Sequence, residues 1–464
     1  MGEAGDRAAR CTDAIIVGGG AGGALMALHL LRGADLPIHV TLIETTSCIG
    51  RGVAYATANP SHLLNVPAGA MSAIDSEPDQ FCDWLCERTG RPAASAAALR
   101  CMFVPRALYG EYLASALAPF AGRGDRAARL SIVHAECVAI EENRAGVTVL
   151  LTNGARHSAE FVVLATGHDA AARGGRCYVN PWTPPRDAGV EPHHHVLLIG
   201  TGLTMVDYLL SLEDAGHRGP IVAISRHGLL PLANRTVTPL PTREHEVPFG
   251  ADTSTVLHWL RARVAAHAAR GGDWREVVDG IRPFNQKIWG NLSAPARQRF
   301  LRHARVWWNV HRHRMAPEIE VRITDALRSG RLVVMPAKIS DVDADAAGAR
   351  VTYRRRGELA AGTMQVDKIV DCRGVVSVPY RPANPALRDL LVRGHAQLDP
   401  LEIGLDVTAD GAIVDGSGRA SQRLFALGPL ARAAFWEITA IPEIRAQCAR
   451  LADRLHGARL RRAG

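Results

Sequence analysis

The chain has 464 residues, which is more than one hydrophobic core usually serves, so we expect two domains. Hydrophobic residues make up 47% and charged residues 22% of the chain, as in an ordinary globular protein, and no run of about 18 uncharged apolar residues predicts a membrane span. The formal net charge of +8 favours anionic partners, but no run of basic residues with interleaved aromatics is present. We therefore expect anionic small molecules as partners, and neither nucleic acid nor a membrane.

The N-terminal residues and the cysteines bear on the cellular compartment. Residues 1–12 contain four charged side chains and no apolar stretch, so we expect no signal peptide. The nine cysteines are scattered, and the close pair Cys82 and Cys86 has no second pair to complete a metal site. The histidines at 193–195 directly precede an expected strand and point in different directions. We therefore expect no metal, no disulfide framework and a cytoplasmic protein with reduced thiols.

The residues after position 12 have the pattern that opens a doubly wound sheet. A short apolar segment at 13–18 ends at glycine and predicts a buried strand, leucines at helical spacing follow it, and a second strand is expected at 38–44. Strand, glycine turn, helix and strand in this order are typical of a parallel α/β sheet. Further along we expect helices at 79–88 and 109–117, and strands at 131–142, 146–152 and 161–166.

A glycine motif stands between the first expected strand and its helix. Its members are Gly18, Gly20, Gly22 and Gly23. Gly18 permits the tight turn, Gly20 allows a pyrophosphate to approach, and Gly23 lets the helix pack on the strand. Glu44 ends the next strand, 44 − 23 = 21 residues after Gly23, which matches the spacing of about 20 for an acid that binds ribose. The pattern predicts an FAD site; a plain glycine turn with a surface Glu is the alternative.

A second unit of the same kind begins after a linker at 171–192 that is rich in Gly, Pro and Arg. It consists of an expected strand at 196–200, a helix at 203–212 and a strand at 221–225, so it repeats the first unit. Residues 253–325 are expected to be mostly helical. Strands return at 331–375, followed by a short strand at 424–428 and a helix at 443–455.

The glycine motif of the second unit is weaker than the first. Met205 takes the place of the third glycine, which predicts looser helix–strand packing, and Asp207 on the same helix is either functional or an ordinary solvated acid. The next strand ends in Ser-Arg-His instead of an acid, and Arg226 there suits a 2′-phosphate that a carboxylate would repel. NADPH is therefore favoured over NADH, with a solvated Arg226 as the alternative. The expected cofactor-binding residues are Gly200, Gly202, Leu203, Thr204 and Arg226.

These elements together predict an α/β fold with two Rossmann-like dinucleotide-binding domains, one for FAD and one for NAD(P)H. We expect the first part of the FAD domain at 1–180 and the NAD(P)H domain, with a helical insertion, at 190–330. Residues 331–464 are expected to return to the FAD domain, which is then discontinuous in sequence.

Several longer motifs resemble known proteins. They lie at 50–55, 62–68, 71–73, 164–168, 300–303, 310–317, 427–429 and 436–445. With them the chain resembles the flavoprotein pyridine-nucleotide oxidoreductases and, more closely, bacterial FAD/NAD(P)-binding proteins of the YdhS type. That group is similar to flavoprotein monooxygenases and hydroxylases with two dinucleotide-binding domains. The resemblance covers about residues 13–450.

The resemblance also implies which residues lie near the flavin, although loop or core packing is the alternative for each. Arg51, Asn65 and Val66, from the motifs at 50–55 and 62–68, are expected near the flavin. Thr166 and Gly167 belong to the motif at 164–168, which resembles the A-T-G strand end of such enzymes. Gly428 and Pro429 are expected beside the flavin ring or ribityl chain at a helix N-terminus, with Trp436 and Thr439 on the same helix.

Several classes of flavoenzyme can be excluded because their sequence features are missing. Cys48 has no partner before Cys82, so a disulfide reductase is not expected, and the second nucleotide motif excludes amine oxidases and one-Rossmann hydroxylases. Hydride transfer needs positioning and no protein nucleophile, so we predict no catalytic triad. The leading hypothesis is an NADPH-dependent flavin monooxygenase that hydroxylates nitrogen or carbon of a small polar substrate with O2. The alternatives are an NAD(P)H-dependent flavin reductase or dehydrogenase without oxygen insertion, and a non-catalytic flavin-bound redox sensor.

A basic cluster supplies the candidate substrate-binding residues. They are His311, Arg312 and Arg314, which suit a carboxylate-bearing substrate or the phosphates of NADPH. A solvated helix face or a structural patch between domains is the alternative, because alternate residues of a helix cannot all face one site.

Overall fold

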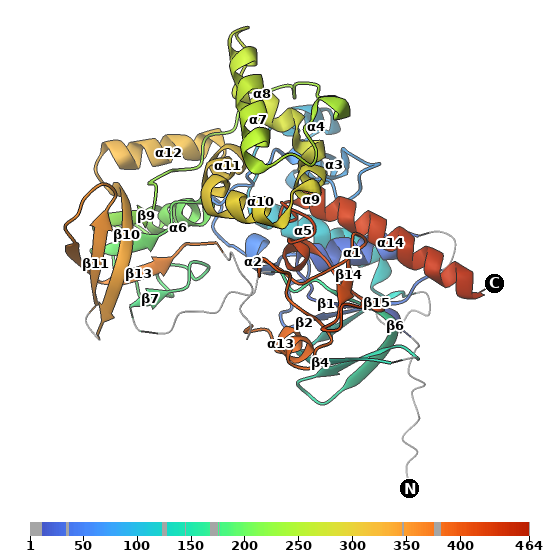
Figure 1. Ribbon diagram of the computed structural model, residues 1–464. Helices are drawn as coiled ribbons and strands as arrows, with labels where there is room; N and C mark the ends of the chain where they lie inside the picture. Colours follow the sequence, from blue (N-terminus) through green and yellow to red (C-terminus); the bar gives the residue numbers. More distant parts are fainter. Residues whose placement is uncertain are drawn as a thin grey trace.

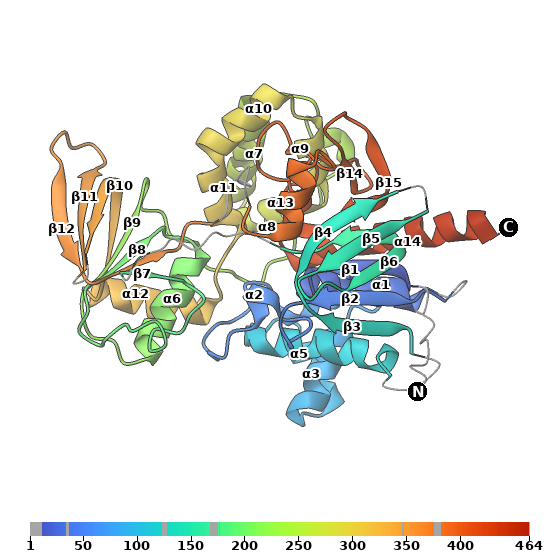
Figure 2. The ribbon, with the colours of Figure 1, turned by 90° about the horizontal axis from the view of Figure 1, so that it is seen from below.

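The computed structural model describes residues 12–33, 37–122, 128–143, 145–167, 175, 177–345, 348–374 and 382–463. His168, the last residue of one motif used for the resemblance, lies outside these ranges. The described residues form two α/β domains, each built on its own sheet, and a separate group of helices (Figures 1 and 2). Among them, no helix is both long and apolar enough to cross a membrane.

The first sheet has the order β14-β15-β6-β1-β2-β3 (Figure 1). β1 lies between β2 and β6 and is parallel to both, and β15 is parallel to β6, so these strands end at the same edge. The bounds are β1 (Thr12–Val17), β2 (Val40–Glu44), β3 (Leu130–His134), β6 (Arg156–Leu164), β14 (Ala412–Val414) and β15 (Ala420–Ala426). A hairpin adds β4 (Cys137–Glu142) and β5 (Val147–Leu151).

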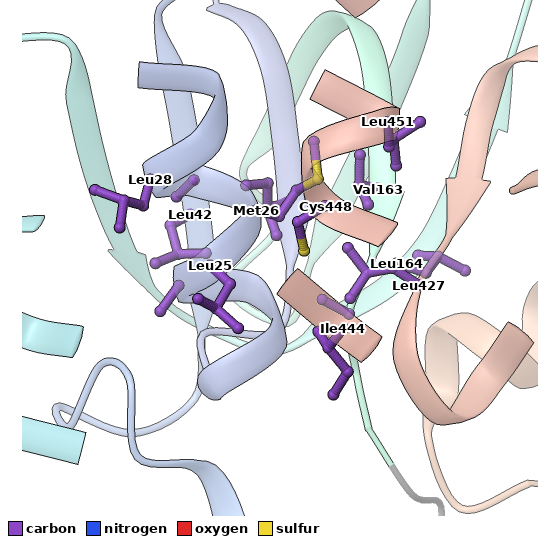
Figure 3. Close-up of a cluster of buried hydrophobic side chains, with 14 of the residues drawn as sticks. Leu25, Met26, Leu28, Leu42, Val163, Leu164, Leu427, Ile444, Cys448 and Leu451 are labelled. Carbon is purple, nitrogen blue, oxygen red and sulfur yellow. The ribbon is translucent and has the colours of Figure 1, made fainter. Parts of the chain in front are cut away.

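Helices cover this sheet with apolar side chains. α1 (Ala21–Arg32) lies against α14 (Ile441–Ala463), and Figure 3 shows Leu25 and Met26 of α1 beside Cys448 and Ile444 of α14. All four side chains belong to the core of the first domain. The other helices of this domain are α2 (Gly52–Tyr55), α3 (Gln80–Thr89), α4 (Ala96–Leu99), α5 (Arg106–Leu117) and α13 (Pro385–Val392).

The second sheet has the order β12-β11-β10-β9-β8-β13-β7. β7, β13, β8, β9 and β10 are parallel neighbours, and β11 and β12 extend the sheet as antiparallel strands. The strands are β7 (Tyr178–Val179), β8 (Val196–Ile199), β9 (Ile221–Ser225), β10 (Leu332–Ala344), β11 (Ala349–Arg355), β12 (Gly362–Val366) and β13 (Lys368–Asp371). α6 (Leu203–Asp214) and α12 (Pro317–Arg328) belong to this domain.

The third group is the helical region, which is inserted between β9 and β10. It comprises α7 (Thr253–Ala268), α8 (Trp274–Gly280), α9 (Asn285–Asn291), α10 (Ala294–Arg299) and α11 (Arg305–Arg312). In Figure 2 it lies between the second sheet at the left and the first sheet at the right.

Two sequence-based expectations were wrong. The strands at 332–371 were assigned to the return into the FAD domain, but they pair in the second sheet, because β10 continues parallel to β9 and β13 inserts beside β8. The chain reaches the first sheet again with β14 and β15. The single strand expected at 131–142 is two strands with different partners: β3 pairs with β2, and β4 pairs with β5.

Candidate functional site

The first glycine turn lies where β1 ends and α1 begins. Gly18 has a φ of +106°, and its N–H donates to the carbonyl of Ile43, 2.8 Å away at the end of β2. A Cβ on Gly18 would stand 2.5 Å from the carbonyl oxygen of Ala165, which follows β6. Because residues with a side chain rarely adopt this φ, both the conformation and the space at this position require glycine.

The next glycines leave bare backbone at the start of α1. A Cβ on Gly23 would lie 1.8 Å from the carbonyl oxygen of Gly18, so helix and strand approach each other directly. A Cβ on Gly20 would lie 3.3 Å from Cα of Gly52, so a second glycine segment faces the turn. The first turn of α1 has no acidic residue and no side-chain cap, which leaves its N–H groups for an anion.

Glu44, the predicted ribose-binding acid, ends β2 beside this turn. Its Oε2 accepts a hydrogen bond of 2.7 Å from the N–H of Gly19. Its Oε1 accepts from the hydroxyl of Thr45 at 2.9 Å and from the N–H of Thr46 at 3.0 Å. The carboxylate is therefore held in place next to the glycines, and its contact with a ribose stays a prediction.

Two further predicted segments lie at the same edge of the first sheet. They are Thr166 with Gly167 after β6, and Gly428 with Pro429 after β15. The N–H of Leu427 donates to the carbonyl of Leu164 at 3.0 Å, so the ends of β15 and β6 are level. A Cβ on Gly22 would lie 3.0 Å from Cδ1 of Leu427, so α1 begins against the end of β15. The fold thus brings these segments together at one edge.

The segment after Gly428 differs from the expected helix. Gly428 has a φ of +64°, and its N–H donates to Oε1 of Gln447 in α14 at 2.9 Å. A 3-10 helix covers only Gly428–Ala431, and the next helix, α14, begins at Ile441. Trp436 and Thr439 therefore lie in turns between two helices, because the positive φ of 66° at Glu437 interrupts regular structure there.

Arg51, Asn65 and Val66 belong to the loops around the first turn. Arg51 directly precedes α2, and the N–H of its neighbour Gly50 donates to the carbonyl of Gly19 at 2.8 Å. Val66 is partly buried against the core of the first domain, and Asn65 is half-buried beside it. The segment that contains Arg51 is thus held against the first glycine turn, and its contact with a flavin stays a prediction.

The second glycine turn repeats the backbone of the first. Gly200 has a φ of +109°, and its N–H donates to the carbonyl of Ile224 at the end of β9, 2.8 Å away. A Cβ on Gly200 would stand 3.0 Å from the carbonyl oxygen of Cys372, which follows β13. Gly202 precedes α6, whose first turn, beginning with Leu203 and Thr204, has no acid and no side-chain cap.

The surroundings of the second turn are different. Nothing lies within 4 Å of a Cβ built on Gly202. Met205, in place of the third glycine, is fully buried in the core of the second domain. Its side chain therefore fills the wider space expected between α6 and the preceding strand. Where the first turn has Glu44, the second has hydroxyls: Oγ1 of Thr201 bonds Oγ of Ser225 at 2.9 Å.

Basic groups gather next to this turn. Arg226, directly after β9, is exposed, and Nη1 of Arg356 donates to Nδ1 of His227 at 3.2 Å. Burial lowers the pKa of His227, and the charges of Arg356 and Arg226 lower it further. Burial and the charge of Arg226 also lower the pKa of Arg305, whose Nε is buried without a hydrogen-bond partner. Arg305 and Arg356 lie far from Arg226 in sequence and carry no local motif that could have identified them.

Arg312, a predicted substrate-binding residue, is engaged within the protein. Its side chain is 7% exposed, its Nε donates to Glu437 at 3.1 Å, and its Nη2 donates to Glu443 at 3.3 Å. Burial alone would raise the pKa of Glu437, but Arg312, His313 and hydrogen bonds from neighbouring side chains lower it overall. These contacts hold the helical region against the first turn of α14 and the segment before it, and a role of Arg312 in substrate binding stays a prediction.

Trp436 also joins the helical region to this segment. Its ring stacks on Trp289 with centroids 4.6 Å apart, and Nε1 of Trp289 donates to the carbonyl of Ala433 at 2.7 Å. Trp436 is buried in a small apolar cluster formed by both parts, whereas Thr439 is exposed. The predicted flavin contact of Trp436 is untested, and its observed contacts anchor the helical region.

Arg314 and His311 lie around Trp274 of α8. Nη2 of Arg314 donates to Asp279, and its guanidinium carbon lies 5.8 Å from the Trp274 ring centroid. The ring of His311 meets Trp274 edge-on at 4.9 Å, and its Nδ1 bonds the carbonyl of Trp307. Arg312 bonds Glu437 and Glu443, whereas Arg314 and His311 contact Trp274, and a role of any of the three in substrate binding stays a prediction.

Comparison with known families places the first part of the chain. Residues 15–169 match the profile of a family described as FAD-NAD(P)-binding. This stretch contains the first glycine turn, Glu44, Arg51 and Thr166 with Gly167. No curated protein sequence matches the chain.

Solved structures match nearly the whole chain. An ornithine N-hydroxylase from Kutzneria sp. 744 is 16% identical with a TM-score of 0.66, and the match covers 97% of this chain and 100% of that one. A cadaverine monooxygenase from Erwinia amylovora, bound to FAD, is 13% identical with a TM-score of 0.68, covering 96% of this chain and 95% of that one. A thioredoxin reductase from T. acidophilum is 11% identical with a TM-score of 0.53, covering 97% and 99%.

At these identities the likeness shows the fold. The chain has a mixed α/β architecture with two sheets built around parallel strands, and it aligns with these structures over nearly its whole length, which confirms the predicted fold class. The match extends through the helical region and the segment with α14.

Proposed function

We propose that the protein is an FAD-dependent monooxygenase that takes electrons from NADPH and hydroxylates nitrogen or carbon of a small polar substrate with O2. The observation that carries this proposal is the pair of uncapped glycine turns, each at the carboxyl edge of its own parallel sheet. The finer resemblance to proteins of the YdhS type is part of the same proposal.

The residues of the first turn fit FAD. The space in front of Gly20 lacks a side chain on both sides, because Gly52 faces it, and the first N–H groups of α1 have no cap. These groups would hold the pyrophosphate, and Glu44 would hold the ribose hydroxyls. When bound, FAD accepts a hydride from NADPH and passes electrons to O2.

The second turn fits NADPH. Its helix end has no acid, and the strand that would carry a ribose-binding acid ends instead in Ser225, Arg226 and His227. The additional charge of Arg356 beside His227 favours a phosphate at this place over a bare hydroxyl. Arg226 and Arg356 would bind the 2′-phosphate, and the N–H groups at Leu203 and Thr204 would bind the pyrophosphate.

Two observations favour a monooxygenase over a dithiol-exchanging reductase. The two structures with the higher TM-scores above are by name an N-hydroxylase and a monooxygenase, whereas the thioredoxin reductase has a lower score. Among the cysteines that the structure describes in the first domain, Cys48 and Cys101 are exposed while Cys82 and Cys86 are buried, and Cys48 and Cys101 lie 101 − 48 = 53 positions apart, unlike the closely spaced pair of a disulfide reductase.

The test is to purify the protein with FAD, add NADPH without oxygen, and then admit oxygen together with a panel of small amines and amino acids. We expect bleaching of the flavin with NADPH, slower bleaching with NADH, and a product that is one oxygen atom heavier than one of the substrates. Bleaching followed by release of all reducing equivalents as hydrogen peroxide, with every substrate, would favour the reductase alternative. No bleaching with either nucleotide would favour the redox sensor.

A further inference from the structure

A partly buried ion pair joins the first domain to the helix that carries the second glycine turn. Nη1 of Arg106, at the start of α5, donates to Oδ2 of Asp207 at 2.7 Å, and its Nη2 donates to Oδ1 at 3.2 Å. The two side chains are 14% and 13% exposed. The Nε of Arg106 also donates to the carbonyl of Leu63 at 2.9 Å, so the guanidinium is fixed on both of its sides.

His62 adds a second link at the same place. Its Nε2 lies 2.9 Å from the carbonyl oxygen of Asp207 and 2.9 Å from Oγ of Ser211. Because a carbonyl only accepts, Nε2 carries the proton, and Nδ1 accepts from the hydroxyl of Thr57 at 2.8 Å. Burial is the main cause that lowers the pKa of His62, which favours this neutral form. Together His62, Arg106 and Asp207 form what we term the clamp.

The clamp connects two parts of the site that would hold different cofactors. Asp207 lies in α6 only a few residues after Gly202, at the end of the helix that would bind the NADPH pyrophosphate. His62 lies just before Asn65 and Val66, the loop expected beside the flavin. Leu63 packs against the core of the second domain, so an apolar side chain lies beside this partly exposed ion pair.

We propose that His62, Arg106 and Asp207 are positioning residues that set the place of α6, and with it the NADPH turn, relative to the flavin loop. The inference rests on the proposed function, because it assumes that both cofactors bind. Hydride transfer depends steeply on the distance and angle between donor and acceptor, so a small displacement of α6 slows the transfer more than it weakens NADPH binding. Arg106 and Asp207 touch neither cofactor in this proposal and act through α6.

A second set of polar contacts, made by Arg322, holds the C-terminal end of α6 and can be compared with the clamp. Nη2 of Arg322 donates to Glu213 at 2.8 Å and to Asp214 at 2.7 Å, and its Nη1 donates to Ser61 at 2.9 Å. Arg322 and Asp214 are more exposed than Arg106 and Asp207, at 31% and 35%, whereas Glu213 is 13% exposed. Removing the Arg322 contacts would loosen the packing of α6 at the end far from its glycine turn. Removing the clamp would loosen it close to the turn.

The experiment measures anaerobic reduction of the FAD-loaded enzyme by NADPH in stopped flow. For Asp207→Asn we expect a fall in the limiting rate of about 100-fold, with at most a few-fold change in the dissociation constant of NADPH and unchanged reduction by dithionite. Arg106→Lys, which keeps the charge but not the two-pronged geometry, should give an intermediate rate. Arg322→Ala should have a smaller effect, and Arg156→Ala, which breaks an exposed pair in the first domain, should have none.

The outcomes separate the proposed function from the inference about the clamp. If wild-type enzyme is not reduced by NADPH, the proposed function fails and the clamp inference fails with it. If wild type is reduced and Asp207→Asn is reduced at the same limiting rate, only the clamp inference is overturned. Loss of FAD or of folding in Asp207→Asn would show a structural role and would also overturn it, and an equal loss of rate in Arg322→Ala would show that the location of the clamp near the turn has no special effect.

Discussion

The two glycine turns share a backbone and differ in what encloses them. In both, the first glycine has a positive φ, +106° at Gly18 and +109° at Gly200. Its N–H donates over 2.8 Å to a carbonyl at the end of the next strand. The first turn is closed by backbone, since a Cβ on Gly23 would lie 1.8 Å from a carbonyl oxygen. The second is closed by the side chain of Met205 and stays open in front of Gly202.

This difference matches the different roles that we propose for the two nucleotides. A cofactor that stays bound through many turnovers benefits from an enclosed turn, which slows its release. A cosubstrate that must leave after each hydride transfer needs a turn that solvent and ligand reach freely. A side chain added at Gly23 of the first turn would therefore clash with backbone, whereas shortening Met205 beside the second turn would leave a cavity.

The largest effect is expected from Gly23→Ala. The added methyl overlaps the carbonyl of Gly18, and no side-chain movement can relieve a clash with backbone. We expect a loss of about 3 kcal/mol in the free energy of unfolding from strain, and a further loss because bound FAD no longer stabilises the fold. The measurement is the ratio of flavin to protein absorbance together with a thermal melt. Gly202→Ala is the matched control and should keep its FAD.

The converse change in the second turn is Met205→Gly. It restores the third glycine of the motif but empties a fully buried position, so we expect a loss of about 3 kcal/mol in the free energy of unfolding. FAD content should stay normal, because the first turn is untouched. Denaturant titration of the FAD-loaded protein checks this. A variant as stable as wild type, with tighter NADPH binding, would contradict the contrast between the two turns.

A smaller effect is expected from the charges beside the second turn. Arg226→Ala removes a charge-assisted contact worth about 1.5–3 kcal/mol, so KM for NADPH should rise about 10- to 100-fold while KM for NADH changes little. Arg356→Ala should act in the same direction. Arg354→Ala, at an exposed position two residues earlier, is the control. Equal changes for both nucleotides would show that these arginines do not recognise the 2′-phosphate.

The smallest effect concerns pH. Burial is the main cause that lowers the pKa values of His62 and His217, on or against the second domain, and of His29 in the first, below their ordinary 6.5. The unfolded chain then binds more protons than the folded one as pH falls through 6.5, so stability is lost in that direction. Each histidine contributes at most about 1.4 kcal/mol per pH unit. Urea titrations at about pH 7 and pH 5.5 measure the loss, and His217→Gln should reduce it; a loss of the same size in that variant would exclude His217 as a source.

The sequence predicted the parts of the site whose physical signal is local. Glycines such as Gly18 and Gly200 stand directly after apolar strands, and the turn geometry at each leaves few other residue types. The pairing of Arg106 with Asp207, 101 residues later, has no such signal, because it depends on how two finished domains meet. The same holds for Arg312 and Glu437, separated by 125 residues. The pattern at 331–375 correctly predicted strands, but strand pattern alone does not say which sheet receives them.

The discontinuity of the first sheet has a consequence for synthesis on the ribosome. β6 is made early, yet its neighbour β15 begins only at Ala420, and α14, which covers α1, comes later still. At about 5–20 residues per second, the gap lasts on the order of tens of seconds. The second sheet is complete by β13, so the middle of the chain can fold while the nascent first domain still exposes an apolar helix face and an unpaired strand edge. During that interval the exposed apolar surface and the unpaired strand edge favour aggregation of the emerging polypeptide.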